Sequence, residues 1–281
     1  MHDMAQDPTP STTVAGCLDG APFLVRHPVH ADLCDDVVRI LGYRENGVAL
    51  DNAVEMAPLA VPLILGFGEP FQIALGRAPA SEDRYDSFTS GLYPGFVLMN
   101  STGRAECIQI DFTPLGARRF FGIPMREIAQ RMVHTVDLGD RDIVRLRDRL
   151  GAETDWRRRF GLVEAVLRRR LERARPQHGA VAWAYERILA SQGTVRIGAL
   201  ARSLDCSRKH LNQRFHEEIG IGPKSTARMV RFNRALTMAR FAEGPDWALI
   251  AADCGYADQA HLVREFRAFS GAPPSALPPF P

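Results

Sequence analysis

The sequence has no long apolar segment and no cysteine pair at short spacing. Its apolar runs, such as residues 60–68, are short and interrupted by Pro62, whereas a membrane-spanning helix needs about 20 apolar residues. The amino terminus has neither the basic start nor the apolar core of a secretory signal peptide. The five cysteines lie far apart, which indicates neither a zinc site nor a disulfide framework. We therefore expect a cytoplasmic protein that spans no membrane.

Patterns of common catalytic and cofactor sites are missing as well. The sequence has no glycine-rich phosphate-binding loop and no nucleophile-bearing Ser or Cys motif. His27, His30 and His134 would make a metal-ligand set only if forced together, because no carboxylate pattern accompanies them and isolated histidines usually lie at the surface or in a hydrogen-bonded core. We predict no catalytic residue, no metal and no cofactor.

Charge is distributed unevenly along a chain long enough for two domains. The protein has 281 residues, of which 46% are hydrophobic and 24% charged, and its net charge is only +2. Residues 1–140 carry 10 basic and 18 acidic side chains, residues 141–175 carry 12 and 6, and residues 176–281 carry 13 and 9. Such a division suits a polyanion-binding domain beside one that avoids polyanions, but ordinary solvated surfaces explain it equally well.

The amino-terminal half is predicted to be rich in strands. Residues 1–14 are expected to be a disordered tail, and residues 15–140 are interrupted every few positions by Pro or Gly. The clearest strand is residues 106–112, where apolar and polar side chains alternate; weaker candidates are residues 63–67, 71–75 and 95–99. Short strands at this spacing favour a barrel or sandwich. Residues 114–132 are expected to be helical.

Residues 141–175 are predicted to be a helical connector. Apolar residues in its second half recur at steps of three and four and form one stripe: Trp156, Phe160, Val163, Leu167 and Leu171. The stripe suits packing on its own domain and pairing with a second copy equally well. Arginine triplets at residues 157–159 and 168–170 lie mostly off the stripe, where phosphate contact is possible but simple hydration is more common. Residues 176–179 mark the domain boundary.

Residues 176–281 are predicted to be all helical and to contain one helix-turn-helix arrangement twice. Ser207 is placed to cap one helix and Asp258, 51 residues later, is placed to cap another. Inward-pointing apolar residues follow each cap: Leu211, Phe215 and Ile219 in the first helix, and Leu262, Phe266 and Phe269 in the second. A helix over residues 223–242 joins the two units.

The repeat suits double-stranded DNA. A helix of twenty residues is about 30 Å long, and successive major-groove faces are about 34 Å apart. One chain would therefore place two helices in neighbouring grooves. A helical bundle that binds proteins would share the inward residues, so only the outward side chains favour DNA; those of the first helix are Lys209, Asn212, Gln213 and His216, and those of the second are Gln259, His261 and Arg264.

These residues resemble the AraC/XylS family of bacterial transcription regulators. The resemblance covers residues 176–274 and depends mainly on residues 200–236 and 250–274, the second being IAADCGYADQAHLVREFRAFSGAPP. It implies that Lys209, Asn212 and Gln213, and in the second unit Gln259, His261 and Arg264, face bases. It also implies phosphate contacts or internal salt links for Arg208, Arg214 and Arg231. The chain departs from the family pattern at Asp205, where a turn glycine is common, and after Pro274.

The amino-terminal half resembles the barrel-type sensor regions of the same family, mainly through residues 112–124. The resemblance implies a small effector at an unknown site, a homodimer and RNA polymerase as a further partner. We therefore predict an α+β protein: a β-rich sensor at residues 15–140, helices at 141–175 and an all-α DNA-binding domain at 176–281. Two alternatives stay open, a cupin-like metalloenzyme with a DNA-targeting tail and a ligand-independent regulator acting through a protein partner.

Overall fold

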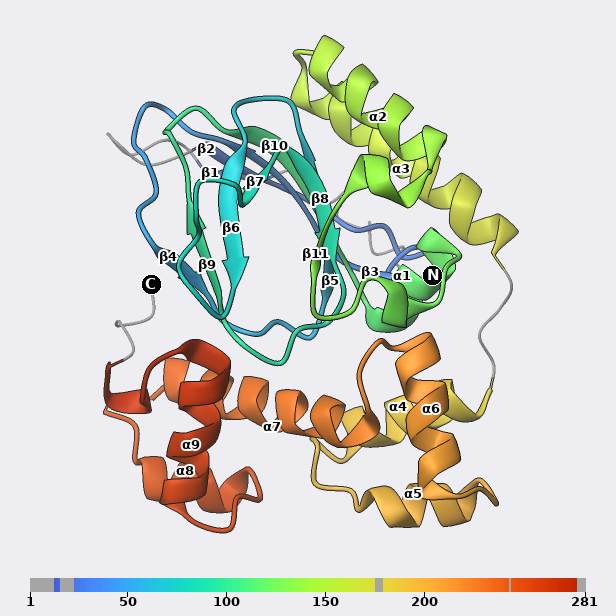
Figure 1. The fold of residues 1–281 in the computed structure, drawn as a ribbon, viewed down its shortest axis with the longest axis vertical. Coiled ribbons are helices and arrows are strands. Elements are labelled where there is room, and N and C mark those ends of the chain that lie inside the picture. The colour runs from blue at the N-terminus through green and yellow to red at the C-terminus, as the bar shows by residue number, and fades with distance from the viewer. Residues whose placement is uncertain (1–12, 16–22, 175–178, 243, 277–281) are drawn as a thin grey trace, which may run out of the picture.

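The computed structural model describes residues 13–15, 23–174, 179–242 and 244–276, with a strand-rich amino-terminal part and a helical carboxy-terminal part (Figure 1). The α+β prediction is confirmed. Most of the expected tail, residues 1–12, lies outside the described residues, and Thr13–Ala15 forms a strand. The strands are β1 (Thr13–Ala15), β2 (Phe23–His27), β3 (Val37–Arg44), β4 (Ala53–Glu55), β5 (Val61–Gly66), β6 (Phe71–Leu75), β7 (Arg84–Tyr85), β8 (Ser87–Ser90), β9 (Val97–Asn100), β10 (Glu106–Phe112) and β11 (Met132–His134).

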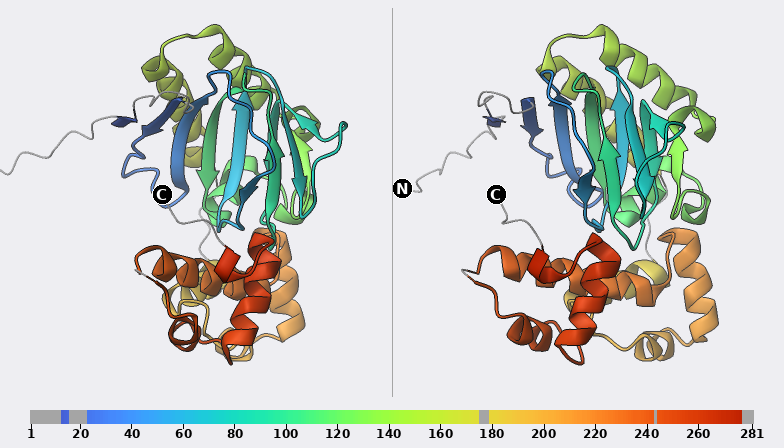
Figure 2. Two further views of the ribbon diagram at one scale, coloured as in Figure 1. Left: turned by 90° about the vertical axis from the view of Figure 1, so that its left-hand side faces the viewer. Right: turned by 60° about the vertical axis from the view of Figure 1, so that its left-hand side comes forward.

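The strands form two antiparallel sheets that face each other (Figure 2). The larger has the order β1-β2-β3-β10-β5-β8-β11, and the smaller has the order β4-β9-β6-β7. Successive side chains of β10 point to opposite faces of the sheet and so join two different hydrophobic cores. Ile108, Ile110 and Phe112 join the core beneath the helices, whereas Cys107 joins the separate cluster between the sheets. The four predicted strands correspond to β10, β5, β6 and β9.

Three helices cover the outer face of the larger sheet: α1 (Pro114–Phe121), α2 (Arg141–Ala152) and α3 (Trp156–Arg173) (Figure 1). The apolar stripe of α3 packs here, with Phe160, Val163 and Leu167 no more than 1% exposed. Gly42 on β3 permits this approach, since a Cβ there would lie 2.5 Å from the Trp156 ring. The predicted connector therefore belongs to the amino-terminal domain, and this stripe is not free to pair with a second copy.

Several arginines of the α3 triplets are paired with acidic residues of the same domain. Arg159 is 5% exposed at its side chain, and its Nη1 lies 2.5 Å from Glu106 Oε1. Arg168 Nε lies 2.8 Å from Asp32 Oδ2, and Arg170 Nη2 lies 2.5 Å from Asp140 Oδ1. These three side chains therefore link α3 to its own domain, whereas Arg157 and Arg158 are exposed.

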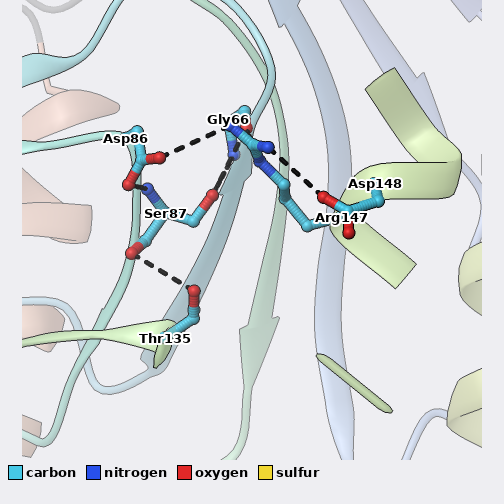
Figure 3. Close-up of polar contacts among 6 residues, drawn as sticks. All are labelled: Gly66, Asp86, Ser87, Thr135, Arg147 and Asp148. Atoms are coloured by element: carbon cyan, nitrogen blue, oxygen red, sulfur yellow. Dashed lines mark hydrogen bonds and ion pairs between the residues drawn. The ribbon is translucent and has the colours of Figure 1, made fainter. Parts of the chain in front are cut away.

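Arg147 connects α2 to the edge of the larger sheet (Figure 3). Its Nε donates to the Gly66 carbonyl at 2.9 Å, and its Nη2 lies 3.4 Å from Asp86 Oδ2. Gly66 N in turn donates to Ser87 Oγ at 3.0 Å, and Thr135 Oγ1 donates to the Ser87 carbonyl at 3.4 Å. This network joins β5, β8, the 3₁₀ helix η2 (Thr135–Leu138) and α2.

The prediction of helix up to residue 132 was wrong beyond α1. Gly122 ends α1 in the left-handed conformation, at φ 68°. Only the 3₁₀ helix η1 (Met125–Glu127) follows, and Gln130 has φ 57° before strand β11. A proline at position 124 and a residue in the left-handed region both interrupt a helix, although the apolar spacing still suggested one.

The carboxy-terminal part contains α4 (Ala180–Ala190), α5 (Ile197–Ser203), α6 (Arg208–Glu218), α7 (Pro223–Arg240), α8 (Trp247–Asp253), α9 (Gln259–Ser270) and the 3₁₀ helix η3 (Pro274–Ala276). The linking helix α7 has 18 residues, about 27 Å. Its buried face carries Met229, Phe232, Leu236 and Ala239, as the spacing predicts. Of the expected domain boundary at residues 176–179, residues 176–178 lie outside the described residues, and Gly179 is the N-cap of α4.

Candidate nucleic-acid interface

The helices α6 and α9 begin at the predicted caps. Ser207 Oγ accepts from His210 N at 3.1 Å, and Asp258 Oδ1 accepts from His261 N at 2.6 Å. Each cap satisfies an amide at the first turn and keeps the start of the helix well defined. The inward residues are confirmed as core, because Leu211, Phe215, Leu262 and Phe266 are each at most 1% exposed.

The turns before α6 and α9 have the same conformation but not the same residue. Asp205 has φ 47° in the first turn, and Gly255 has φ 73° in the second. Asp is among the few side chains that adopt this region readily. Asp205 therefore occupies the place of the usual turn glycine, and the departure from the family pattern leaves the first helix-turn-helix intact.

Most outward residues predicted to contact bases are exposed. In α6 these are Lys209, Asn212 and Gln213, and in α9 they are Gln259 and Arg264. His216 is half-buried, and the Asn212 and His216 side chains lie beside Gly222 at the start of α7. His261 is also half-buried, with its Nε2 3.6 Å from Glu265 Oε1. The two histidines are thus less available than the other five residues.

Both candidate recognition helices run with their carboxy-terminal ends toward the amino-terminal domain (Figures 1 and 2). Gly220, just after α6, lies next to Ala129, and Gly271, just after α9, lies next to Phe96. The capped ends of α6 and α9 therefore point away from the sheets. The helices α6 and α9 lie at opposite ends of α7. This spacing suits the insertion of one helix into each of two neighbouring major grooves.

The three arginines predicted to contact phosphates or to form internal salt links have different surroundings. Arg208 is exposed at the start of α6. Arg214 is exposed as well, but its Nη2 lies 2.7 Å from Glu218 Oε1. Arg231 is only 17% exposed at its side chain, where it lies 3.4 Å from Glu265 Oε1 and 5.3 Å from the centre of the Tyr256 ring. Arg208 is the best placed of the three to reach a phosphate, and Arg231 makes an internal link.

Glu265 was not singled out from the sequence, yet it is at the centre of the contact between α7 and α9. Its side chain is 3% exposed, and Arg228 Nε donates to its Oε1 at 2.6 Å. A polar hollow here is lined by Lys224, Arg228, Arg231, His261, Arg264 and Glu265. From the sequence, Glu265 could have been noticed as the one acidic residue of α9, and α7 as a helix rich in arginine. That Glu265 lies opposite Arg228 and Arg231 depends on how the two helices pack.

Residues 200–277 match a family model described as a helix-turn-helix domain. Residues 200–277 of this chain are an AraC-type helix-turn-helix domain. The resemblance predicted from the sequence, and the DNA-binding function that it implies, are therefore confirmed for this part of the chain.

Solved structures with a similar arrangement are distant in sequence. ToxT from Vibrio cholerae is 10% identical, with a TM-score of 0.44 over 83% of this chain and 97% of that one. Unsaturated fatty acid bound ToxT from V. cholerae strain SCE256 is 10% identical, with a TM-score of 0.43 over 83% and 95%. The AraC-like transcriptional activator CuxR is 16% identical, with a TM-score of 0.32 over 80% and 83%. No curated protein matches the sequence.

The amino-terminal domain contains a cavity of about 350 Å³ between its two sheets. Its lining is mainly apolar and comes from both sheets, including Leu41, Ile64, Phe71, Ile73, Phe88 and Met99. These lining residues come from distant segments of the chain, which are brought together only by the pairing of the strands. An effector site in this cavity could therefore not be predicted from the sequence. A largely apolar cavity with a few polar groups is the usual form of a small-molecule site.

The three histidines considered for a metal site do not come together. His27 Nε2 and His30 Nε2 lie 2.8 and 3.2 Å from Glu164 Oε1, whereas His134 stacks on Tyr85 at 4.6 Å. β2 and β11, which carry His27 and His134, lie near opposite edges of the larger sheet. Among the described residues, no group of three or more His, Cys, Asp or Glu residues is placed to hold a metal, and no helix is long and apolar enough to cross a membrane.

Proposed function

We propose that the protein regulates transcription by binding two neighbouring major grooves of one operator under the control of a small molecule. The observation that carries this proposal is the pair of capped helices, α6 and α9, which expose polar side chains at the two ends of α7. The protein would act by sequence readout and not by catalysis, in the cytoplasm, where the chromosome is accessible.

Base contacts are assigned to the exposed residues: Lys209, Asn212 and Gln213 from α6, and Gln259 and Arg264 from α9. Lys and Arg suit guanine, and the amide side chains suit adenine. Arg208 would contact a phosphate, and Arg214 would do so after release from Glu218. Because Arg231 and His261 contact Glu265, we assign them to the support of α9.

The domain that contains the cavity contacts both helix-turn-helix units, and at the second unit the contact comes from a cavity-lining segment. Residues 53–62 supply several lining residues, and within this segment Ala57 N donates to the Phe269 carbonyl of α9 at 3.3 Å. Asn233 Nδ2 of α7 donates to the Ala57 carbonyl at 3.1 Å. At the other unit, Arg126 of η1 forms a salt bridge with Glu217 of α6. A ligand that shifts the cavity wall would therefore change how the two units are held.

A homodimer and a contact with RNA polymerase are further parts of this proposal. The α3 stripe is covered by its own domain, so a dimer interface would have to use another surface. The second unit exposes Leu249 on α8 and Phe241 after α7, at 59% and 87%. These side chains offer a place for a protein contact away from the proposed base-contacting residues.

In vitro selection of bound oligonucleotides, starting from DNA upstream of the protein's own gene, tests the proposal. The expected product is a site with two preferred segments separated by about one helical turn, or 10 to 10.5 base pairs. Gln213→Ala should relax the preference in one segment and Arg264→Ala in the other. Selection that yields no sequence preference, or one segment only, would overturn the model of two grooves.

A further inference from the structure

The cavity between the sheets has an unusual balance of charge. Four aromatic rings contribute to its lining, from Tyr43, Phe71, Phe88 and Tyr93. The lining also contains one carboxylate, that of Glu55, and it contains no Lys, Arg or His among the described residues. The described lining therefore offers a ligand one acidic group and several electron-rich ring faces, but no positively charged side chain.

Glu55 points into this cavity from the edge strand β4. Ala53 and Glu55 both line the cavity, and the Glu55 side chain is also exposed to solvent, whereas Ala53 is half-buried. Within the described residues, the Glu55 carboxylate has neither a hydrogen bond nor a salt bridge. Desolvation by the surrounding protein, followed by repulsion from Asp111, raises the pKa of this carboxyl, and Arg39 opposes the rise. Glu55 is accessible from the cavity, yet it is poorly compensated there.

The nearest arginine does not neutralise Glu55. Arg39 Nε donates to Asp111 Oδ2 at 2.7 Å, and Gln109 Nε2 donates to Asp111 Oδ1 at 2.8 Å. Arg39 is therefore already paired and is absent from the cavity lining. Arg39 is thus engaged by Asp111, and Glu55 has no ion pair of its own among the described residues.

We propose that the cavity binds a hydrophobic organic cation, an ammonium-type group on an apolar body, with Glu55 as its counter-ion. The inference rests on the proposed function of the cavity as the effector site. An anion would have to leave water for a site with a carboxylate and no cation, which is costly. A cation would gain the attraction of Glu55 together with the faces of the aromatic rings.

A set of three ligands with one chain length isolates the charge preference. We would titrate the full-length protein calorimetrically with decyltrimethylammonium, decanol and decanoate, below the concentrations at which each forms micelles. The cation should bind at least tenfold more tightly than decanol, and decanoate should bind more weakly than decanol. Equal or tighter binding of decanoate, or no binding of the cation, would overturn the proposal.

Variants at position 55 make the assignment specific. Glu55→Gln should remove most of the advantage of the cation and leave decanol binding nearly unchanged. Glu55→Lys should reverse the preference toward decanoate, and Glu172→Gln, at an exposed position of α3, should change neither. If Glu55→Gln keeps the full advantage of the cation, Glu55 is not the counter-ion. DNA selection is independent of these titrations, so a failed titration with intact DNA specificity rejects the ligand class and not the regulator.

Discussion

The Arg228 Nε on α7 donates to the Glu265 carboxylate on α9 at 2.6 Å, and this bond ties the second recognition helix to the linking helix. Arg231 Nη2 approaches the same oxygen at 3.4 Å from the next turn of α7. Glu265 is nearly fully buried, so its charge is stable only because these cations surround it. The direction in which α9 presents Arg264 therefore depends on a residue that does not itself face the solvent.

Removing the Glu265 side chain should destabilise the carboxy-terminal domain. Glu265→Ala leaves Arg228 and Arg231 without their shared acid, and we expect a loss of about 2 to 3 kcal/mol in the free energy of unfolding. Urea denaturation measures this change. Glu186→Ala, an exposed glutamate on α4, is the control and should cost less than about 0.5 kcal/mol. Equal stability of the two variants would show that the buried carboxylate does not hold α9.

Arg264→Ala should weaken binding to the selected operator by about 1 to 3 kcal/mol and relax the preference at one base pair. The reason is that an exposed arginine of a major-groove helix forms two bonds to one guanine. Binding to variant operators, with every base tested at each position, measures the effect. Arg267→Ala, one turn along α9, is the matched control and should leave the preference unchanged. Uniform loss on all sequences in Arg264→Ala would contradict a base contact.

Arg208 and Arg231 should respond differently to the same substitution. Arg208→Ala is expected to lower affinity for every sequence and to reduce the salt dependence by about one ion, because Arg208 is exposed at the start of α6. Arg231→Ala should instead lower the midpoint of thermal unfolding and leave the salt slope unchanged, because Arg231 faces Glu265 and Tyr256. A reduced salt slope in Arg231→Ala would assign it to a phosphate after all.

Binding of decyltrimethylammonium should weaken as the pH falls. Desolvation and repulsion from Asp111 raise the pKa of the Glu55 carboxyl above its ordinary value of 4.5, so Glu55 loses its charge at a higher pH than a glutamate with the ordinary pKa does. The folded state then binds more protons than the unfolded state in the window above 4.5, and stability rises as the pH falls through that window. Titrations and unfolding curves of wild type and Glu55→Gln across this window measure both effects. Identical pH profiles of the two proteins would contradict the assignment.

Loss of the Asn233 side chain should loosen the contact between the cavity wall and α7. Asn233→Ala removes the donor to the Ala57 carbonyl and should cost about 1 kcal/mol. Hydrogen exchange should accelerate around residues 53–60 and at the carboxy-terminal end of α9, where Ala57 N donates to Phe269. Ser203→Ala on the exposed face of α5 is the control. Unchanged exchange at both segments would show that this link does not couple the domains.

The helix-turn-helix units were predictable because their signals are local. A cap such as Ser207 or Asp258 acts on amides two or three residues away, and apolar steps of three and four define the inner face of one helix without reference to any other element. The same reasoning failed at residues 124–132, where Pro124 and the φ of Gln130 outweighed a helical spacing.

Local pattern could not predict the surroundings of single charged residues. For Arg231 the resemblance left a phosphate contact and an internal salt link open, and its position opposite Glu265 depends on how α9 crosses α7. The α3 stripe allowed two partners, and its own sheet covers it because Gly42 leaves room for Trp156.

By itself the sequence determined the two capped helices, their inward and outward faces and thereby the DNA-binding class, because helical periodicity and capping act within a few residues. The cavity, the unpaired Glu55 within it and the acid that orients α9 arose only when distant segments were brought together. β10 lies between β3 and β5, although 61 residues separate it from β3 and 39 from β5 along the chain. Burial and charge compensation are properties of such non-local neighbours, and no short window of the chain contains them.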